Sequence, residues 1–478
     1  MKKKYVRWTL WTIASPFILF IILCILIYLP PIQNFLVDKA AVYASEATGM
    51  NISVGRISLS FPLNLVVTNV DAASPHNDTL LSVRRLQVNV QLLPLLKKQV
   101  EVDGISLQGA TVNSNDLIHG MRLNGTLGEL FISSHGVALD PETAIVNKVL
   151  LKDTDLSLCL NDTAAADTAA SDTTYWKIIL QDIDLQNVSF ALDMPLDSLS
   201  LAASLDNAIL RDGLIDLHKS AYSLQTFRIE NGRVRYDNGK PLAADSLSSG
   251  LDPSHIALTD IGVKLDSLYY GGRNMKAIIS QFVLKERSGV EIVSATGRMV
   301  SNDKVLRVPS LKLETRDSYL ELNAAMDWNA LDFKDEGLVS ARLMADIGKP
   351  DVVRFMGSMD EKFIRQYPSE PLRIRTGIDG DLNKLKLTTL TAELPGALGL
   401  FARGELTHLT DSLLRGGDIT LEAETKDLKF VSTLAEGIEI PYGTRLEGKF
   451  TMAGTKMGTD LLLMQPEAQA VVAADTIP

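Results

Sequence analysis

The sequence predicts a mainly β protein: an N-terminal transmembrane helix followed by an elongated, repetitive β-sheet with short helical islands. Three observations predict this fold class. An uncharged apolar run covers residues 9–29, period-two alternation dominates after Gly49, and similar strand outlines recur without a strict repeat length. Because 478 residues exceed one ordinary core, several domains or a stack of repeats is expected.

The N-terminus combines a basic tail, residues 1–8, with the apolar run. At about 1.5 Å per residue, residues 9–29 span about 31 Å, close to the thickness of a hydrocarbon core. A cleaved signal peptide is the alternative, but the run is long and no small-x-small cleavage site follows it. The basic residues predict a cytoplasmic N-terminus and an exported body. These residues are Lys2, Lys3, Lys4 and Arg7.

Residues 31–48 are predicted to form an amphipathic helix next to the membrane. Apolar residues such as Ile32, Leu36 and Tyr43 recur at helical spacing, and Gly49 ends the pattern. The apolar side of this helix could lie on the bilayer or pack on the first strands, and the sequence favours neither.

Residues 49–160 form the first predicted β region. From Leu59 to Val67, and again from Leu86 to Leu92, apolar residues alternate with mostly polar ones, which predicts strands with one apolar face. The apolar positions are the candidate ligand-facing residues of the chain. They are Leu59, Phe61, Leu63, Leu65, Val67, Leu86, Val88, Val90 and Leu92.

Residues 161–174 have low complexity and no large apolar side chain, so they predict a disordered, solvated loop. We expect that deleting or lengthening this loop changes stability little. The β pattern continues over residues 175–478. In one stretch the alternation slips by one residue between Leu185 and Val188, which predicts a bulge or turn. Helical pattern is confined to islands such as residues 351–367 and 428–437.

The residues that usually carry chemistry show no catalytic or metal-binding pattern. Cys24 lies in the apolar run and Cys159 in a predicted strand, which predicts no disulfide. The six histidines have no close ligand spacing, and no phosphate loop or nucleophile elbow occurs. Asp182 and Asp184 are interpreted as solvated strand edges. With a formal charge of −11, the chain is a poor nucleic-acid binder. We predict no enzyme, cofactor or metal.

Two stretches resemble the AsmA/TamB superfamily, and its TamB-like members in particular. One is "FLVDKAAVYASEATGMNISVGRISLSFPLNLVVTNVDAAS", and the other is the Gly-punctuated "LRIRTGIDGDLNKLKLTTLTAELPGALGLFARGELTHL". The resemblance implies a periplasmic β-groove (β-taco-like) anchored in the bacterial inner membrane. It also implies a link to phospholipid movement and outer-membrane biogenesis. Larger members dock to an outer-membrane barrel through a C-terminal domain absent here, so the chain is interpreted as an N-terminal portion or a short relative.

The leading functional expectation is that the candidate residues line a groove that carries phospholipid acyl chains between the inner and outer membranes. An exposed chain of sixteen carbons costs on the order of 12 kcal/mol in water, and a continuous apolar surface removes most of this cost. One alternative is an assembly factor that holds outer-membrane β-strands along an exposed sheet edge. Another is a structural spacer without cargo.

Overall fold

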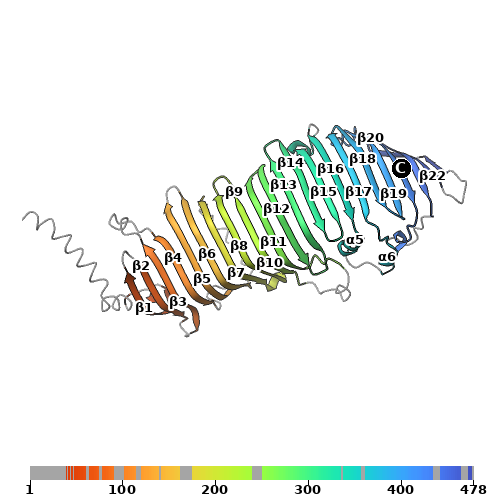
Figure 1. Ribbon diagram of the computed structural model, residues 1–478. Coiled ribbons are helices and arrows are strands. Elements are labelled where there is room, and N and C mark those ends of the chain that lie inside the picture. The colour runs from red at the N-terminus through yellow and green to blue at the C-terminus, as the bar shows by residue number, and fades with distance from the viewer. Residues whose placement is uncertain are drawn as a thin grey trace, which may run out of the picture. The chain divides into compact units, whose positions relative to one another are not determined.

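The computed structural model confirms a mainly β protein with few helices (Figure 1). It describes residues 39, 41–42, 45–46, 48–60, 64–74, 78–90, 102–114, 120–138, 142–161, 175–239, 250–334, 337–356, 361–433, 442–464 and 472–475. The basic tail, the apolar run and residues 162–174 lie outside this set. Among the described residues, no helix has the length and apolar character that crossing a bilayer requires. Described residues between 39 and 48 are helical.

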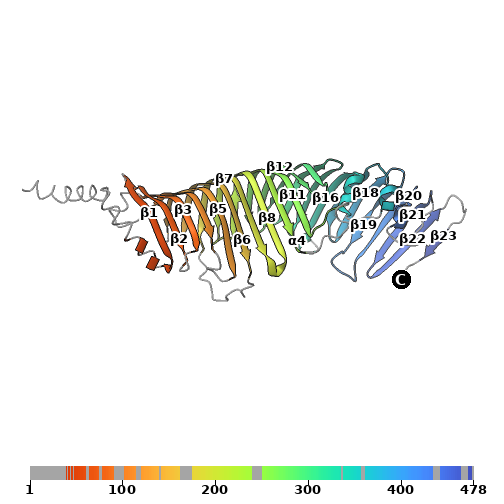
Figure 2. The same cartoon turned by 90° about the horizontal axis from the view of Figure 1, so that it is seen from below.

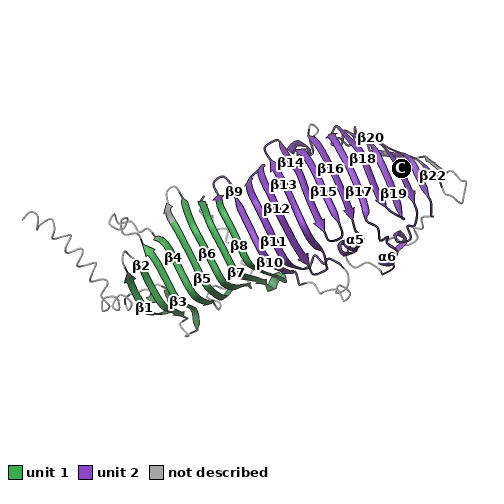
Figure 3. Ribbon diagram, viewed as in Figure 1, with its two compact units in different colours: residues 1–213 green, residues 214–478 purple. Residues whose placement is uncertain are grey.

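The chain divides into two compact units, residues 1–213 and 214–478 (Figure 3). The boundary falls inside a strand, at Gly213. The N-terminal unit contains β1 (Asn51–Ser60), β2 (Asn64–Ala73), β3 (Thr79–Val90), β4 (Val102–Asn113), β5 (Met121–Ala138), β6 (Thr143–Leu160), β7 (Lys177–Met194), the 3-10 turn η1 (Pro195–Asp197) and β8 (Leu199–Asp216) up to Gly213.

The C-terminal unit continues with strands and a few short helices. Its strands are β9 (Ala221–Leu224), β10 (Thr226–Asp237), β11 (His255–Gly271), β12 (Asn274–Glu286), β13 (Glu291–Ser301), β14 (Val305–Thr315), β15 (Tyr319–Asp327), β16 (Leu338–Ile347), β17 (Leu372–Asp381), β18 (Lys384–Leu394), β19 (Leu398–Thr407), β20 (Gly416–Thr425), β21 (Arg445–Ala453), β22 (Lys456–Met464) and β23 (Val472–Asp475). Its helical elements are α4 (Trp328–Leu331), α5 (Lys349–Phe355), α6 (Glu361–Gln366) and η2 (Val431–Thr433).

Strand pairing in the N-terminal unit is antiparallel from β1 through β6, whereas β6 and β7 run parallel. The chain must therefore return from Leu160 to Lys177 along the length of a strand of 18 residues. The parallel pairing argues against the prediction that residues 161–174 can be removed at little cost, because a short connection joins only antiparallel neighbours.

In each strand from β1 to β7, the apolar residues follow period two, but the pattern shifts by one residue at a single position. These positions are aligned across the strands. Asn69, Gly109, Asp153 and Asn187 adopt positive φ values of 53°, 63°, 49° and 51° in mid-strand. The neighbouring register pairs align this line across seven strands. We name it the crease column: Gly55, Asn69, Arg84, Gly109, Gly128, Asp153 and Asn187.

The crease column explains the slip in the sequence pattern of β7, which falls at Asn187. On β3 the adjacent residues Arg84 and Arg85 are both exposed, and on β6 Lys152 and Asp153 are both exposed. Two neighbouring exposed residues shift the alternation of apolar and polar positions along the strand by one residue. The apolar residues on both arms of each strand therefore share one face of the sheet.

The C-terminal unit is an antiparallel meander in which β10 to β23 each pair with the next strand along the chain (Figure 2). The short strand β9 pairs with both β8 and β11. Helix α4 lies at one end of these strands. Helices α5 and α6, predicted as a helical island, lie at the other end.

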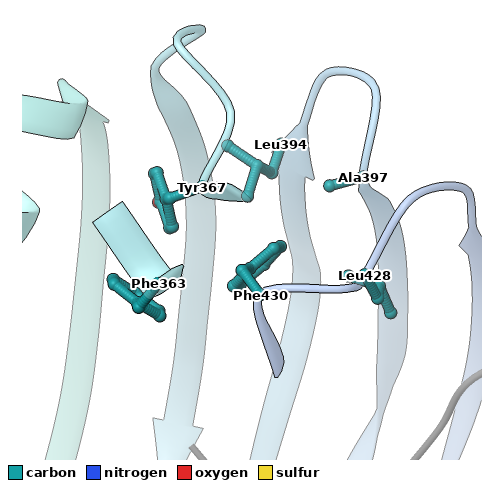
Figure 4. Packing of buried hydrophobic residues seen from close by; sticks show 6 residues of the cluster. All are labelled: Phe363, Tyr367, Leu394, Ala397, Leu428 and Phe430. Atoms are coloured by element: carbon teal, nitrogen blue, oxygen red, sulfur yellow. The ribbon is translucent and has the colours of Figure 1, made fainter. Parts of the chain in front are cut away.

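Two buried clusters close the two ends of the strands in the C-terminal unit. At the α6 end, Phe363, Tyr367 and Phe430 pack ring against ring, with centroids 5.1–5.8 Å apart (Figure 4). At the α4 end, Ala330 packs with Val339 and Leu382. Both buried clusters of the described residues belong to this unit.

Candidate functional site

One face of the N-terminal unit carries aliphatic side chains in continuous rows that run across the strands. On one side of the crease column, two rows each take one residue from every strand of β1 to β7. They are Leu59–Leu65–Val88–Ile105–Ile132–Val149–Ile183 and Ile57–Val67–Leu86–Leu107–Leu130–Leu151–Leu185.

Two further rows lie on the other side of the crease column and are nearly as apolar. They are Val54–Val70–Val83–Ala110–Leu127–Thr154–Val188 and Ile52–Ala72–Leu81–Val112–Gly125–Leu156–Phe190. No position in the four rows carries a charge. We name these four rows the apolar face.

The apolar face is only partly covered. Val67, Val83, Ala72, Ala110 and Thr154 are buried, but most of the remaining positions are half-buried. The exceptions are Leu81, Ile105 and Phe190, which are exposed by more than a third. The described residues of this unit contain no buried hydrophobic cluster. A sheet that buries its apolar side against a second layer shows such a cluster. Among the described residues, no second layer covers the apolar face.

The candidate residues that the sequence suggested divide into two groups. Leu59, Leu65, Val67, Leu86 and Val88 belong to the apolar face, and Val90, which pairs with Val102, follows Val88 on the same side of β3. Phe61, Leu63 and Leu92 lie outside the described residues, as do Lys2, Lys3, Lys4 and Arg7.

Sequence reasoning missed the contributions of β4, β5 and β6, for example Leu107, Leu130 and Leu151. A signal was present in "LLKDTDLSLCL", where Leu156, Leu158 and Leu160 keep period two but follow Leu151 after an odd step of five that contains Asp153. That step lies at the crease column and interrupts the period-two pattern, so the strand is harder to recognise from the sequence.

The opposite face of the N-terminal unit is held by polar side-chain contacts between strands. Asn187 Nδ2 donates to Asp153 Oδ1 at 2.9 Å, and Ser189 Oγ donates to Asp155 Oδ2 at 2.8 Å. Asp182 and Asp184, interpreted from the sequence as solvated edges, instead form ion pairs with Arg211 of β8. The single positive charge of Arg211 offsets one of the two negative charges, and the contacts indicate a structural role for both carboxylates.

The C-terminal unit repeats the same division of faces. Three uncharged rows cross β14 to β21: Leu313–Leu320–Ala345–Ile374–Ala392–Leu400–Ala423–Leu446, Leu311–Leu322–Leu343–Thr376–Leu390–Ala402–Leu421–Gly448, and Val308–Ala324–Ala341–Ile378–Leu387–Gly404–Ile419–Phe450. The other face carries cross-strand ion pairs, including Arg375–Asp346 at 2.7 Å and Lys449–Asp418 at 2.9 Å. Large and small residues are mixed in these rows, whereas the rows of the N-terminal unit consist mostly of large aliphatic residues.

The described residues offer little for metal binding or acid–base chemistry. They contain no group of three side chains that could hold a metal ion.

His255 is buried between Asp252, 2.8 Å from its Nδ1, and Asp237, 3.6 Å from its Nε2. Its hydrogen bond lowers the pKa of the Asp252 carboxyl. This site anchors the start of β11.

Comparison with known protein families and with curated proteins found no match. Membership of the AsmA/TamB superfamily therefore stays a prediction from the residues quoted above.

Proposed function

We propose that the apolar face binds phospholipid acyl chains and carries them between the inner and outer membranes of a bacterial envelope. In this proposal residues 9–29 anchor the chain in the inner membrane and the body lies in the periplasm, where it supports outer-membrane biogenesis. The observation that carries the proposal is the set of four uncharged, half-buried rows that continue across β1 to β7.

The chemistry of the rows suits a moving chain better than a fixed small ligand. Each methylene removed from water gains about 0.8 kcal/mol, wherever on the face it lies. Small-ligand sites usually add a few placed polar groups that fix one orientation. The rows are almost purely aliphatic, so many positions along them have similar binding free energies. Movement from one position to the next then meets low barriers.

Photocrosslinking at two neighbouring residues of β3 tests the proposal. Val88 belongs to the apolar face, and Gln87 points to the other face, where its Nε2 donates to Asn89 Oδ1 at 3.0 Å. A photoreactive amino acid at Val88 should capture phospholipid in cells, identified by mass spectrometry, and one at Gln87 should not. Capture of polypeptide at Val88 would favour the assembly-factor alternative. Capture of neither would leave the chain a structural spacer.

A further inference from the structure

Large and small side chains form a checkerboard on one face of the C-terminal unit. Each strand from β16 to β21 contributes one large and one small side chain to two neighbouring rows, and the order alternates from strand to strand. The pairs are Leu343–Ala345, Ile374–Thr376, Leu390–Ala392, Leu400–Ala402, Leu421–Ala423 and Leu446–Gly448. The strand register places every small residue beside a large residue of the next strand, as in Ala345–Ile374 and Leu343–Thr376.

The small residues join into a narrow zigzag line across the six strands, which we name the furrow. Its floor is Ala345, Thr376, Ala392, Ala402, Ala423 and Gly448. Its walls are Ile374, Leu400 and Leu446 on one side and Leu343, Leu390 and Leu421 on the other. Ala345 and Ala402 are 2% and 3% exposed, and the other floor residues and all wall residues are half-buried. None of these residues carries a charge.

The two buried clusters of the unit stand on the same face, one on each side of the furrow. On β17, Leu372 packs against the Phe363 cluster and Ile378 packs against the Ala330 cluster. Ile374 and Thr376 lie between them on the same side of the strand. A second sheet packs face to face at about 10 Å, and the helical segments on both sides of the furrow obstruct that approach. The clusters therefore disfavour a broad occupant such as the sheet of a second copy.

The dimensions of the furrow match one unbranched hydrocarbon chain. Facing wall residues, such as Ile374 and Leu343, are diagonal neighbours on the sheet, about 7–8 Å apart. Carbon atoms contact best at about 3.5–4.0 Å, so a single file of methylene carbons touches both walls and leaves no room for a methyl branch. Six strands at a spacing of about 4.8 Å give the furrow a length of about 24 Å. Because one leaflet of a hydrocarbon core is about 15 Å deep, a complete acyl chain fits along it.

An extended peptide suits the furrow less well than an acyl chain. Each peptide unit carries an N–H and a C=O group that need partners when they leave water. The strands below the furrow already use their own backbone groups in the sheet. The uncharged floor and walls therefore favour a chain without polar groups.

We propose that the furrow binds a single unbranched acyl chain, laid across the strands from β16 to β21. This inference rests on the function proposed above, because it takes acyl chains as the cargo. It adds a requirement on the shape of the chain: straight chains enter the furrow, and chains with methyl branches do not.

A photoreactive fatty acid tests the proposal with the full chain. The protein is purified in a steroid-based detergent, which has no alkyl chain to compete, and is incubated with palmitic acid that carries a diazirine in mid-chain. Mass spectrometry should map adducts to wall residues such as Leu390 and Leu400. An excess of palmitic acid should lower these adducts about tenfold more than the same excess of phytanic acid, whose sixteen-carbon backbone carries methyl branches.

Filling the floor is the matched mutational test. Ala392 and Ala423 are half-buried, so the double variant Ala392→Leu with Ala423→Leu places two large side chains in the furrow. Ala324→Leu is the control, because Ala324 is a half-buried alanine of β15 on the same face but outside the furrow. Furrow adducts should fall about fivefold or more in the double variant and stay unchanged in the control.

Val88, on the apolar face of the N-terminal unit, reports separately on the function proposed above. Adducts at Val88 without adducts in the furrow would overturn the furrow proposal alone. Absence of adducts from both regions would count against the proposed function as well. Equal competition by the two fatty acids would also overturn the furrow proposal, and this comparison uses the parent protein, so it does not depend on the folding of any variant.

Equal labelling of the furrow in the parent and in a folded double variant would likewise overturn it.

Discussion

Asn187 of β7 donates a hydrogen bond to Asp153 of β6 at 2.9 Å, and both residues have positive φ. These two residues stand side by side in the crease column, where the parallel strands reverse their alternation together. Asn and Asp are the non-glycine residues that tolerate this conformation best.

Two replacements of Asn187 distinguish the contribution of its positive φ from the contribution of its hydrogen bond to Asp153. Asn187→Ala and Asn187→Gly both lose the bond to Asp153, but only Ala adds the left-handed penalty of about 1–2 kcal/mol. Urea unfolding should therefore rank Asn187→Ala as the less stable variant by about that amount. Equal stabilities would mean that the positive φ at this position is not a constraint.

A charge on the apolar face should impair ligand binding more than folding. Val88 is half-buried, so water still reaches a carboxylate there, whereas Val83 on the same strand is 5% exposed. Val83→Asp should lose about 1–3 kcal/mol of stability and Val88→Asp clearly less. Lipid capture from a crosslinker at Leu86 should fall sharply in Val88→Asp. If Val88→Asp unfolds the protein as readily as Val83→Asp, the row through Val88 lines a closed core.

Deletion of residues 162–174 should disrupt the parallel pair of β6 and β7. An 18-residue strand extends up to about 59 Å, and the three residues that remain between Leu160 and Lys177 reach about 15 Å. Hydrogen exchange of β7 amides should become fast in the deletion variant. Replacing the same segment with Gly and Ser at equal length is the control and should leave exchange slow. Slow exchange after deletion would exclude the parallel pairing.

The aromatic cluster at the α6 end should contribute strongly to the C-terminal unit. Phe363 is 1% exposed and contacts both Tyr367 and Phe430. Phe363→Ala should cost about 3–5 kcal/mol, measured by hydrogen exchange of β18 amides in denaturant. Leu413→Ala, on an exposed turn of the same unit, should stay within about 0.5 kcal/mol of the parent.

Alkaline pH should weaken the same cluster through Tyr367. Burial raises the pKa of its phenol above the usual value of 10.0. A raised folded-state pKa contributes stability that is complete below the unfolded pKa and is lost as pH rises through the folded pKa. The parent should therefore lose stability above about pH 10 relative to Tyr367→Phe. Parallel stability curves for the two proteins would assign the alkaline effect to other groups.

The sequence predicts the alternation of apolar and polar residues within each strand, but it does not predict which strands pair or in which direction. Leu86 and Val88 were assigned to one face because period two is a local property. The parallel direction of β6 and β7 was not predicted, since alternation is the same in both directions. Contacts such as Phe363 with Phe430 join residues far apart in the chain, and no local pattern specifies them. The rows through Leu107 and Leu130 require the register of several strands at once.

The crease column has a consequence for how the strands find their partners. A slip of two residues between neighbouring strands leaves alternation intact, so apolar and polar patterning alone cannot reject it. Because every strand from β1 to β7 shifts its alternation at the crease column, the same slip would place Asn187 beside a residue other than Asp153. It would also turn some apolar side chains next to the crease column toward the polar face. The crease column, in which Asn69, Gly109, Asp153 and Asn187 have positive φ, thus favours one strand register in a way that unbroken alternation cannot.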